Sequence, residues 1–166
     1  MIPKSLTMCM WGGIMGNIIE KTSSRIEERL EVSTYISKLV YALENNNAKI
    51  TFQEERHVDN KRSVQYTNKY TVAKLFPNED PVEAIKRELK SLKVEEYIET
   101  VKDIRFPKKS EMRVFGKCYG SDEVYIKLRV ELIQVSIGGV DDTVFVMSFH
   151  FSTVEFIDVV FPYCKR

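Results

Sequence analysis

The sequence is poor in the residues that build metal sites and phosphate loops. Its 166 residues include only two histidines, three cysteines and seven glycines. The cysteines (Cys9, Cys118 and Cys164) are widely spaced and form no Cys-x-x-Cys pair, so a structural zinc site is not expected. No glycine-rich phosphate loop, no Ser-x-x-Lys nucleophile motif and no pair of catalytic carboxylates is recognisable. We therefore expect no structural zinc site, and no recognised motif calls for a cofactor.

The chain also lacks an excess of charge of one sign. It has 25 Lys and Arg against 24 Asp and Glu, which gives a formal net charge of +1. This balance excludes a protein that coats nucleic acid by bulk charge, so any phosphate binding must come from local clusters of cations. With 43% hydrophobic and 30% charged residues, the composition is that of a single globular domain. The unpaired cysteines favour a reducing, cytoplasmic location.

No long apolar run is present. The N-terminal stretch MIPKSLTMCMWGGIM is rich in Met but is interrupted at Gly12 and Gly13. A secretory signal needs a longer apolar core with a small-residue cleavage site, and a membrane span needs about 18 or more apolar residues. We expect residues 1–16 to be an extension, either upstream of an alternative start at Met15 or packed on the domain. No membrane partner is expected.

Hydrophobic periodicity predicts helices in the first half of the chain. Residues 17–44 carry apolar side chains on a helical period, and a break near residues 31–34 would divide them into two helices. A further helix is expected to run from Pro81 to about Ser91, because Asp80 suits an N-cap and proline suits the first helical position.

The segments between these helices are less regular. Lys49–Phe52 fits a short strand, and residues 63–73 fit a strand or a helix equally well. Residues 99–111 read as a polar connector, and the loop QEERHVDN reads as exposed, with its His57 in solvent. The order predicts an α+β fold: one domain over 17–166, helical over 17–98, with N-terminal helices packed on a small antiparallel C-terminal sheet over 112–163.

The last third of the chain holds three strand-like runs within residues 113–151. Gly120-Ser121-Asp122 suits the turn between the first two runs, and Gly138–Asp142 suits the next turn. Basic, phenolic and imidazole groups stand at alternate positions along these runs. If the runs pair as a meander, these groups merge into one cationic face that suits a phosphodiester. They are Arg113, Lys117, Tyr125, Lys127, Arg129 and His150.

Four segments in this order resemble one known family. They are LKVEEY from Leu92, VFGK from Val114, VYIKL from Val124 and VMSFH from Val146, and the tail with Phe161-Pro162-Tyr163 agrees with them. Together they are similar to the MqsR-type toxins of bacterial toxin–antitoxin systems, within the RelE-like ribonuclease superfamily. The resemblance covers roughly residues 80–163. No single segment is specific, but four in the right order are much less expected by chance.

This resemblance implies a RelE-like fold and a metal-independent endoribonuclease. Such enzymes use the ribose 2′-OH to attack the adjacent phosphate of mRNA. The family's strand tyrosine and lysine fall on Tyr125 and Lys127, and His150 stands where the best-known member has lysine. Two positions depart from the family: Glu99 replaces a lysine, and Gly116 replaces a glutamine, with Lys117 beside it. The implied partner is an antitoxin protein, for which a helix-turn-helix domain is one option.

The residue types allow the same assignment of catalytic roles. His150 suits a general acid or base, because imidazole titrates near neutral pH. Lys117 and Lys127 would stabilise phosphate charge, and Tyr125 would position the phosphate or stack on a base. Each residue also has a plainer interpretation. A histidine at a strand end is often structural, and a strand tyrosine is common in any sheet.

Four further cations are candidates for RNA binding: Arg113, Arg129, Lys108 and Lys109. The strand arginines would assist at the phosphate, and the loop lysines would contact the RNA backbone. The alternative is that Lys127 and Arg129 only solvate the outer face of a sheet and that the loop is simply exposed. Cys118 is expected to be a small buried residue. A non-catalytic RNA- or protein-binding module on the same fold is the second function that the sequence allows.

Overall fold

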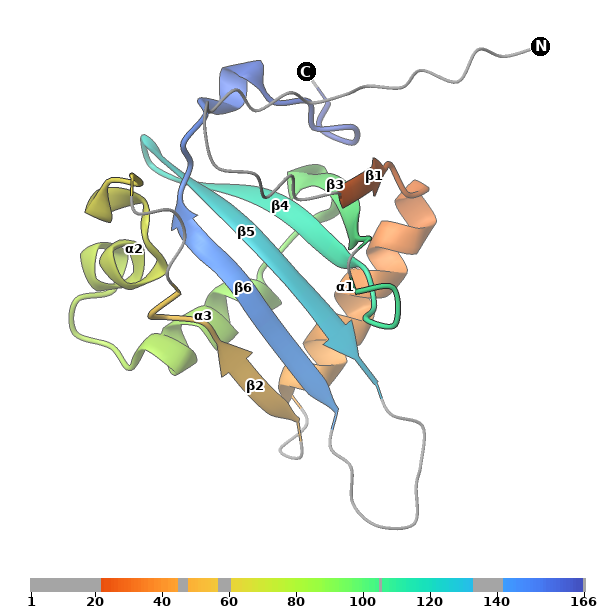
Figure 1. Ribbon diagram of the computed structural model, residues 1–166, viewed down its shortest axis with the longest axis horizontal. Helices are drawn as coiled ribbons and strands as arrows, with labels where there is room; N and C mark the ends of the chain where they lie inside the picture. The colour runs from red at the N-terminus through yellow and green to blue at the C-terminus, as the bar shows by residue number, and fades with distance from the viewer. Residues whose placement is uncertain (1–21, 45–47, 57–60, 105, 133–141, 166) are drawn as a thin grey trace.

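The computed structural model describes residues 22–44, 48–56, 61–104, 106–132 and 142–165 (Figure 1). Residues 1–16 and His57 therefore lie outside the described residues, as does the Gly138–Asp142 turn apart from Asp142. The elements follow one another along the chain as β1 (Thr22–Arg25), α1 (Arg29–Glu44), β2 (Lys49–Phe52), η1 (Val64–Tyr66), α2 (Asn68–Leu75), α3 (Pro81–Lys90), η2 (Val94–Glu96), β3 (Tyr97–Asp103), β4 (Met112–Tyr119), β5 (Asp122–Glu131), β6 (Thr143–Phe151) and η3 (Phe156–Asp158).

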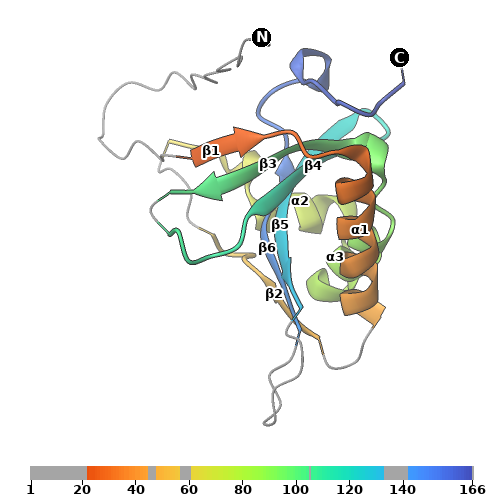
Figure 2. The same cartoon turned by 90° about the vertical axis from the view of Figure 1, so that its right-hand side faces the viewer.

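One six-stranded sheet organises the fold, with the strand order β1-β3-β4-β5-β6-β2. All neighbouring strands are antiparallel except β2, which runs parallel to β6 at one edge. The three α-helices lie on one face of this sheet, and no α-helix of the described residues covers the other face, where Phe156 of the 3-10 turn η3 packs next to Gly116 (Figure 2). The α+β class is therefore confirmed. The sheet also takes strands from the N-terminal half of the chain, so the division into helical 17–98 and a C-terminal sheet is wrong.

The main core lies between the helices and the sheet. Buried side chains of α1 and α3, such as Leu39 and Ile85, pack there against Phe115, Ile126 and Phe149 of the strands. None of the helices that the structure describes is both long enough and apolar enough to cross a membrane.

Helix α3 begins where the sequence predicts it. The Asp80 carboxylate accepts hydrogen bonds from the backbone N–H groups of Val82 and Glu83, both at 3.0 Å. These bonds satisfy two of the donors that a helix start leaves without a partner. Pro81 occupies the first position, where no N–H is needed.

Helix α1 starts later than the periodicity indicates and has no break. Residues 22–25 (TSSR) form strand β1, which pairs with β3 from Asp103 to Thr100. All four residues are exposed, as an edge strand allows, and Thr22 among them is β-branched. Near the expected break, the Thr34 hydroxyl donates to the Leu30 carbonyl at 2.8 Å, and the helix continues.

Asn68 fixes the position of α2 against the sheet. Its side-chain amide donates to the carbonyls of Gln53 (2.7 Å) and Met147 (3.0 Å), while its oxygen accepts from the Phe149 N–H (2.9 Å). This buried amide joins the turn after β2, helix α2 and strand β6. Residues 63–73, which fit strand or helix equally well, are thus a 3-10 turn followed by α2. The short strand at Lys49–Phe52 is confirmed.

The polar run after residue 96 is largely a strand. Residues 97–103 form β3, not a connector, with Tyr97, Thr100 and Val101 buried. An irregular register between Tyr97 and Glu99 disturbs the period-two alternation, which explains why the strand is not visible in the sequence. Beyond the sheet, the tail to Lys165 carries only the 3-10 turn η3, so Pro162 lies outside any strand.

Candidate functional site

The hairpin between β4 and β5 decides which cations share a face. Its turn is the two-residue pair Gly120-Ser121, with Gly120 at φ 65°, and Tyr119 pairs with Asp122. A three-residue turn of Gly120, Ser121 and Asp122 would shift the register by one residue. Since side chains alternate between the faces, such a shift moves a whole strand's side chains to the opposite face.

The observed register sends two of the predicted site residues to the helix side. Arg113 pairs with Leu128 and Lys117 pairs with Val124, and both of these partners are buried in the main core. Paired residues of neighbouring strands point to the same face. The expectation of one common cationic face is therefore wrong for Arg113 and Lys117.

Arg113 is occupied by a buried carboxylate. Its guanidinium binds Glu27 with two hydrogen bonds, at 2.6 and 3.2 Å, and lies 4.4 Å from the centre of the Tyr35 ring. The Glu27 side chain is 1% exposed and also accepts from Arg25 at 2.8 Å. Burial of a carboxylate is costly unless cations pair with it. Arg113 thus stabilises the fold beneath α1. The prediction that it contacts RNA does not fit this position.

Lys117 has the same kind of role beside α3. Its ammonium lies 3.1 Å from the carboxylate of Glu88, which also accepts a hydrogen bond from the Tyr119 hydroxyl at 2.8 Å. Burial raises the pKa of Glu88, but the bonds from Tyr119, Lys117 and Arg87 outweigh it and leave that pKa below its usual value. The catalytic role predicted for Lys117 does not fit this position.

The remaining predicted strand residues lie together on the opposite face of the sheet, which no described α-helix covers and which we call the helix-free face. Tyr125 of β5 pairs with His150 of β6, Lys127 pairs with Ser148, and Arg129 pairs with Phe145. The rings of Tyr125 and His150 stack, with 5.3 Å between their centres and 21° between their planes. The sequence pattern therefore places these four groups on one face correctly: Tyr125, Lys127, Arg129 and His150.

His150 is held as a neutral imidazole. It is 6% exposed, and its Nδ1 lies 2.8 Å from the Phe151 carbonyl, which can only accept, so Nδ1 carries the proton. Nε2 is then an acceptor, and it faces the guanidinium of Arg62 at 3.4 Å. Burial lowers the pKa of His150 to about 4, and the charges of Arg62 and Arg56 act in the same direction. At neutral pH this side chain can accept a proton but has none to donate from Nε2.

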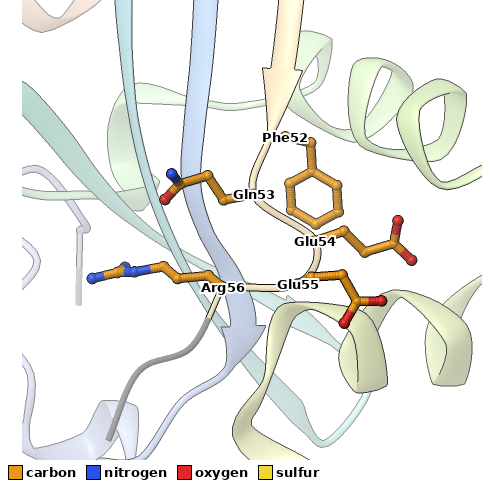
Figure 3. Close-up of a pocket in the computed structure, with 5 residues that line it drawn as sticks. All are labelled: Phe52, Gln53, Glu54, Glu55 and Arg56. Atoms are coloured by element: carbon orange, nitrogen blue, oxygen red, sulfur yellow. The ribbon is translucent and has the colours of Figure 1, made fainter.

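Arg56 and Arg62 are site residues that sequence reasoning missed. Both follow β2, whose parallel pairing with β6 brings them to the helix-free face. The Arg56 guanidinium donates to the Ser148 hydroxyl at 3.1 Å. Figure 3 shows the turn after β2, where Gln53 and Arg56 point to one side and the carboxylates of Glu54 and Glu55 to the other. Arginines in a loop of mixed charge carry no local signal of this pairing.

A hollow of about 270 Å³ lies on the same face beside this group. We call it the sheet hollow; it is lined by Thr22, Gln53, Arg56, Val101, Asp103, Phe106, Lys109, Ser110, Met112, Lys127, Arg129, Phe145 and Met147. Of the two loop lysines predicted to bind RNA, Lys109 lines the sheet hollow, whereas Lys108 is exposed and does not.

Glu99 and Gly116, the two positions that differ from the MqsR-type pattern, both lie on strands of the sheet. Glu99 pairs with Val114, which pairs with Lys127, so Glu99 stands in the same row across the sheet as Lys127. At Gly116, an added Cβ would lie 2.7 Å from the Phe156 ring and 2.8 Å from the Phe161 ring. The C-terminal tail thus occupies the space that a longer side chain at position 116 would need.

Two further observations complete the site. Cys118 is exposed rather than buried, because it lies near the end of β4 on the side away from the helices. Within the described parts of the chain, no group of three or more His, Cys, Asp or Glu side chains is arranged to hold a metal ion.

Comparison with known proteins finds no relative of this chain. No family model matches the chain, and neither a curated protein nor a solved structure matches it significantly. The resemblance to MqsR-type toxins therefore rests on the four sequence segments themselves.

Proposed function

We propose that this protein is the toxin of a toxin–antitoxin pair and cleaves mRNA as a metal-independent endoribonuclease with a RelE-like fold. One observation carries the proposal. A neutral imidazole, His150, lies beside the cationic side chains of Arg56, Arg62 and Lys127 on the helix-free face. A base next to positive charge is what attack of a ribose 2′-OH on a phosphodiester requires.

The proposed reaction assigns one role to each group. Nε2 of His150 accepts the proton of the 2′-OH while the 2′-oxygen forms its bond to phosphorus. The bond from phosphorus to the 5′-oxygen then breaks, and the Lys127 ammonium supplies the proton to this leaving oxygen. The products are one RNA with a 2′,3′-cyclic phosphate and one with a 5′-hydroxyl. Arg56 and Arg62 stabilise the extra negative charge on the pentacovalent phosphate.

Tyr125 acts here as a positioning residue. Its ring covers one side of the imidazole, and the bond from Nδ1 to the Phe151 carbonyl fixes the tautomer. Together they aim Nε2 away from its own strand. The Arg62 guanidinium, which now faces Nε2, moves onto the phosphate when RNA binds.

The burial of His150 favours a second candidate, a non-catalytic module that binds RNA or protein. At 6% exposure the imidazole gives a substrate little access unless Arg62 moves. In that case the cations of this face would bind RNA, or an acidic partner protein, without cleavage.

Cleavage by the purified protein separates the two candidates. Incubated with mRNA and a chelator, it should produce 5′-hydroxyl and 2′,3′-cyclic phosphate ends. The His150→Gln variant should cleave roughly 100-fold or more slowly, the usual contribution of a general base. Lys90→Gln, an exposed change on α3, serves as the control. Ends with 5′-phosphates would contradict the mechanism, and binding without cleavage would establish the module.

The toxin assignment needs a separate test in cells. Induced wild-type protein should stop growth, whereas His150→Gln should not. A protein encoded beside the gene, with or without a helix-turn-helix domain, should restore growth when it is co-expressed and should co-purify with the toxin. Unimpaired growth on induction of soluble wild-type protein would contradict the assignment.

A further inference from the structure

The helix-free face contains an apolar patch that the proposed chemistry does not use. Val101, Met112 and Val114 form a buried cluster separate from the main core, and Phe145 and Met147 pack against it. The cluster draws on strands β3, β4 and β6, which lie next to β5 in one sheet. The three cluster residues are buried, whereas Phe145 and Met147 are partly exposed and form an apolar part of the wall of the sheet hollow.

Cations surround this patch. The sheet hollow lies over it and has four cationic side chains among its lining residues, namely Arg56, Lys109, Lys127 and Arg129. Asp103 is the one carboxylate among the described residues that line it. The Arg129 guanidinium lies 4.7 Å from the centre of the Phe145 ring. A ligand that fits must be flat and apolar in its body and negatively charged at its edge.

The dimensions restrict the ligand further. At about 270 Å³, the sheet hollow is at the lower limit of small-molecule pockets, which span about 300–1,000 Å³. It thus accommodates one ring system and not a folded segment of protein. A nucleobase with its phosphate has this size, shape and charge, and unpaired bases stack readily on aromatic rings and guanidinium planes.

The sheet hollow also lies next to the candidate catalytic residues. Lys127 lines it and stands two residues from Tyr125 on the same face of β5. Arg56 lines it as well and binds Ser148, two residues before His150. A phosphate held between Lys127 and Arg56 would therefore be shared by the sheet hollow and the imidazole.

We infer that the sheet hollow is the subsite for one unpaired base, belonging to a nucleotide that flanks the scissile phosphate. This inference rests on the proposed ribonuclease function and adds its substrate selectivity. Gln53, Asp103 and Ser110 line the hollow with the polar groups that distinguish one base edge from another. The sheet hollow then determines the sequence at which the RNA is cut.

Two variants test the subsite without touching the catalytic groups. Met147→Trp fills the sheet hollow, and Phe145→Ala removes the ring on which Arg129 rests. Ile157→Trp, at a residue 79% exposed on η3, adds the same indole outside the hollow and is the matched control. The melting temperature of each variant shows whether the fold is intact.

Binding is measured by fluorescence anisotropy in the His150→Gln background, in which the RNA stays whole. The probes are a single-stranded RNA of about ten nucleotides and the same strand with abasic sites throughout. Both hollow variants should bind the intact strand roughly 5- to 100-fold more weakly and the abasic strand with unchanged affinity. Equal losses on the two strands, or no loss on either, would overturn the inference.

The distribution of cleavage sites separates this inference from the proposed function. With His150 present, Met147→Trp and Phe145→Ala should cut mRNA at altered or less selective positions. Cleavage at unchanged positions would overturn the base subsite and leave the ribonuclease standing. Selective binding of the intact strand by a wild-type protein that never cleaves would overturn the ribonuclease and leave the base site standing.

Discussion

Strands β4 and β5 present cations on both faces of one sheet, and the two sets are used differently. On the helix side, Arg113 and Lys117 neutralise the carboxylates of Glu27 and Glu88. On the helix-free face, Lys127 and Arg129 line a hollow with a single carboxylate among its described lining residues. The residue type is the same, but the acids differ in exposure: Glu27 and Glu88 are 1% and 13% exposed, whereas Glu131, which lies 3.7 Å from Arg129, is 44% exposed. Cations paired with largely buried acids maintain the fold, and cations that line an open hollow create a field that attracts phosphate.

The largest expected effect is on stability, at Arg113. Replacing it by Met leaves the buried Glu27 carboxylate with Arg25 as its one remaining ion-pair partner among the described residues, which should lower the free energy of unfolding by about 3 kcal/mol. Urea denaturation measures this loss. The double variant Arg113→Met with Glu27→Gln should recover much of it, because no charge is then left buried. RNA cleavage per folded molecule should stay at the wild-type level, and a selective loss of cleavage would remove the distinction between the two faces.

Lys127→Met should have the opposite effects to Arg113→Met: a large loss of cleavage and little change in stability. Cleavage should fall roughly 100-fold, because the variant loses both a charge at the phosphate and the proposed proton donor. The melting temperature should change little, because Lys127 lines the sheet hollow on the helix-free face and does not belong to the main core. The rate and the melting curve are measured on the same preparation. A large fall in melting temperature with a normal rate would assign Lys127 to the fold instead.

The pH dependence of stability should show the lowered pKa of His150. Because its pKa is lowered to about 4 in the folded protein, from 6.5 in the unfolded chain, the unfolded state binds more protons between pH 4 and 6.5. Stability should therefore fall as the pH drops through this window, by roughly 2–3 kcal/mol in all. Urea titrations of the wild type and of His150→Gln at several pH values measure the difference, which the variant should lack.

The low pKa of His150 also determines how the rate of cleavage depends on pH. A base that stays unprotonated down to about pH 4 keeps cleavage nearly constant between pH 7 and 5. A loss of activity centred near pH 6.5 would instead indicate an exposed histidine with an ordinary pKa.

Local patterns predicted much of this arrangement. The α+β class, helix α3 with its Asp80 cap, and the shared face of Tyr125, Lys127, Arg129 and His150 follow from periodicity and short-range chemistry. The face of Arg113 and Lys117 was predicted wrongly because it depends on one residue in the hairpin turn. A two-residue turn at Gly120-Ser121 pairs Lys117 with Val124 and so points it at the helices.

Arg56 and Arg62 lay beyond sequence reasoning for a different reason. Their position results from the parallel pairing of β2 with β6, which lie far apart in the chain. Asn68 then holds the turn after β2 against β6 through its bonds to Gln53 and Met147. No periodic pattern records such a long-range contact, so the two arginines that flank His150 could not be assigned to the site.

The smallest expected effect is on stability at Gly116, where the C-terminal tail borders the helix-free face. At Gly116, a methyl group would come within 3.0 Å of the Phe156 and Phe161 rings, so Gly116→Ala should lower the free energy of unfolding by about 1–2 kcal/mol through overpacking. Urea denaturation measures it, with Gly116→Ala in a Phe156→Leu background as the control, because the smaller side chain should relieve the contact. Gly116 pairs with Tyr125, so a displaced tail would also disturb the ring that stacks on His150. If Gly116→Ala keeps full stability and full cleavage, the tail can move without cost and does not form an edge of the site.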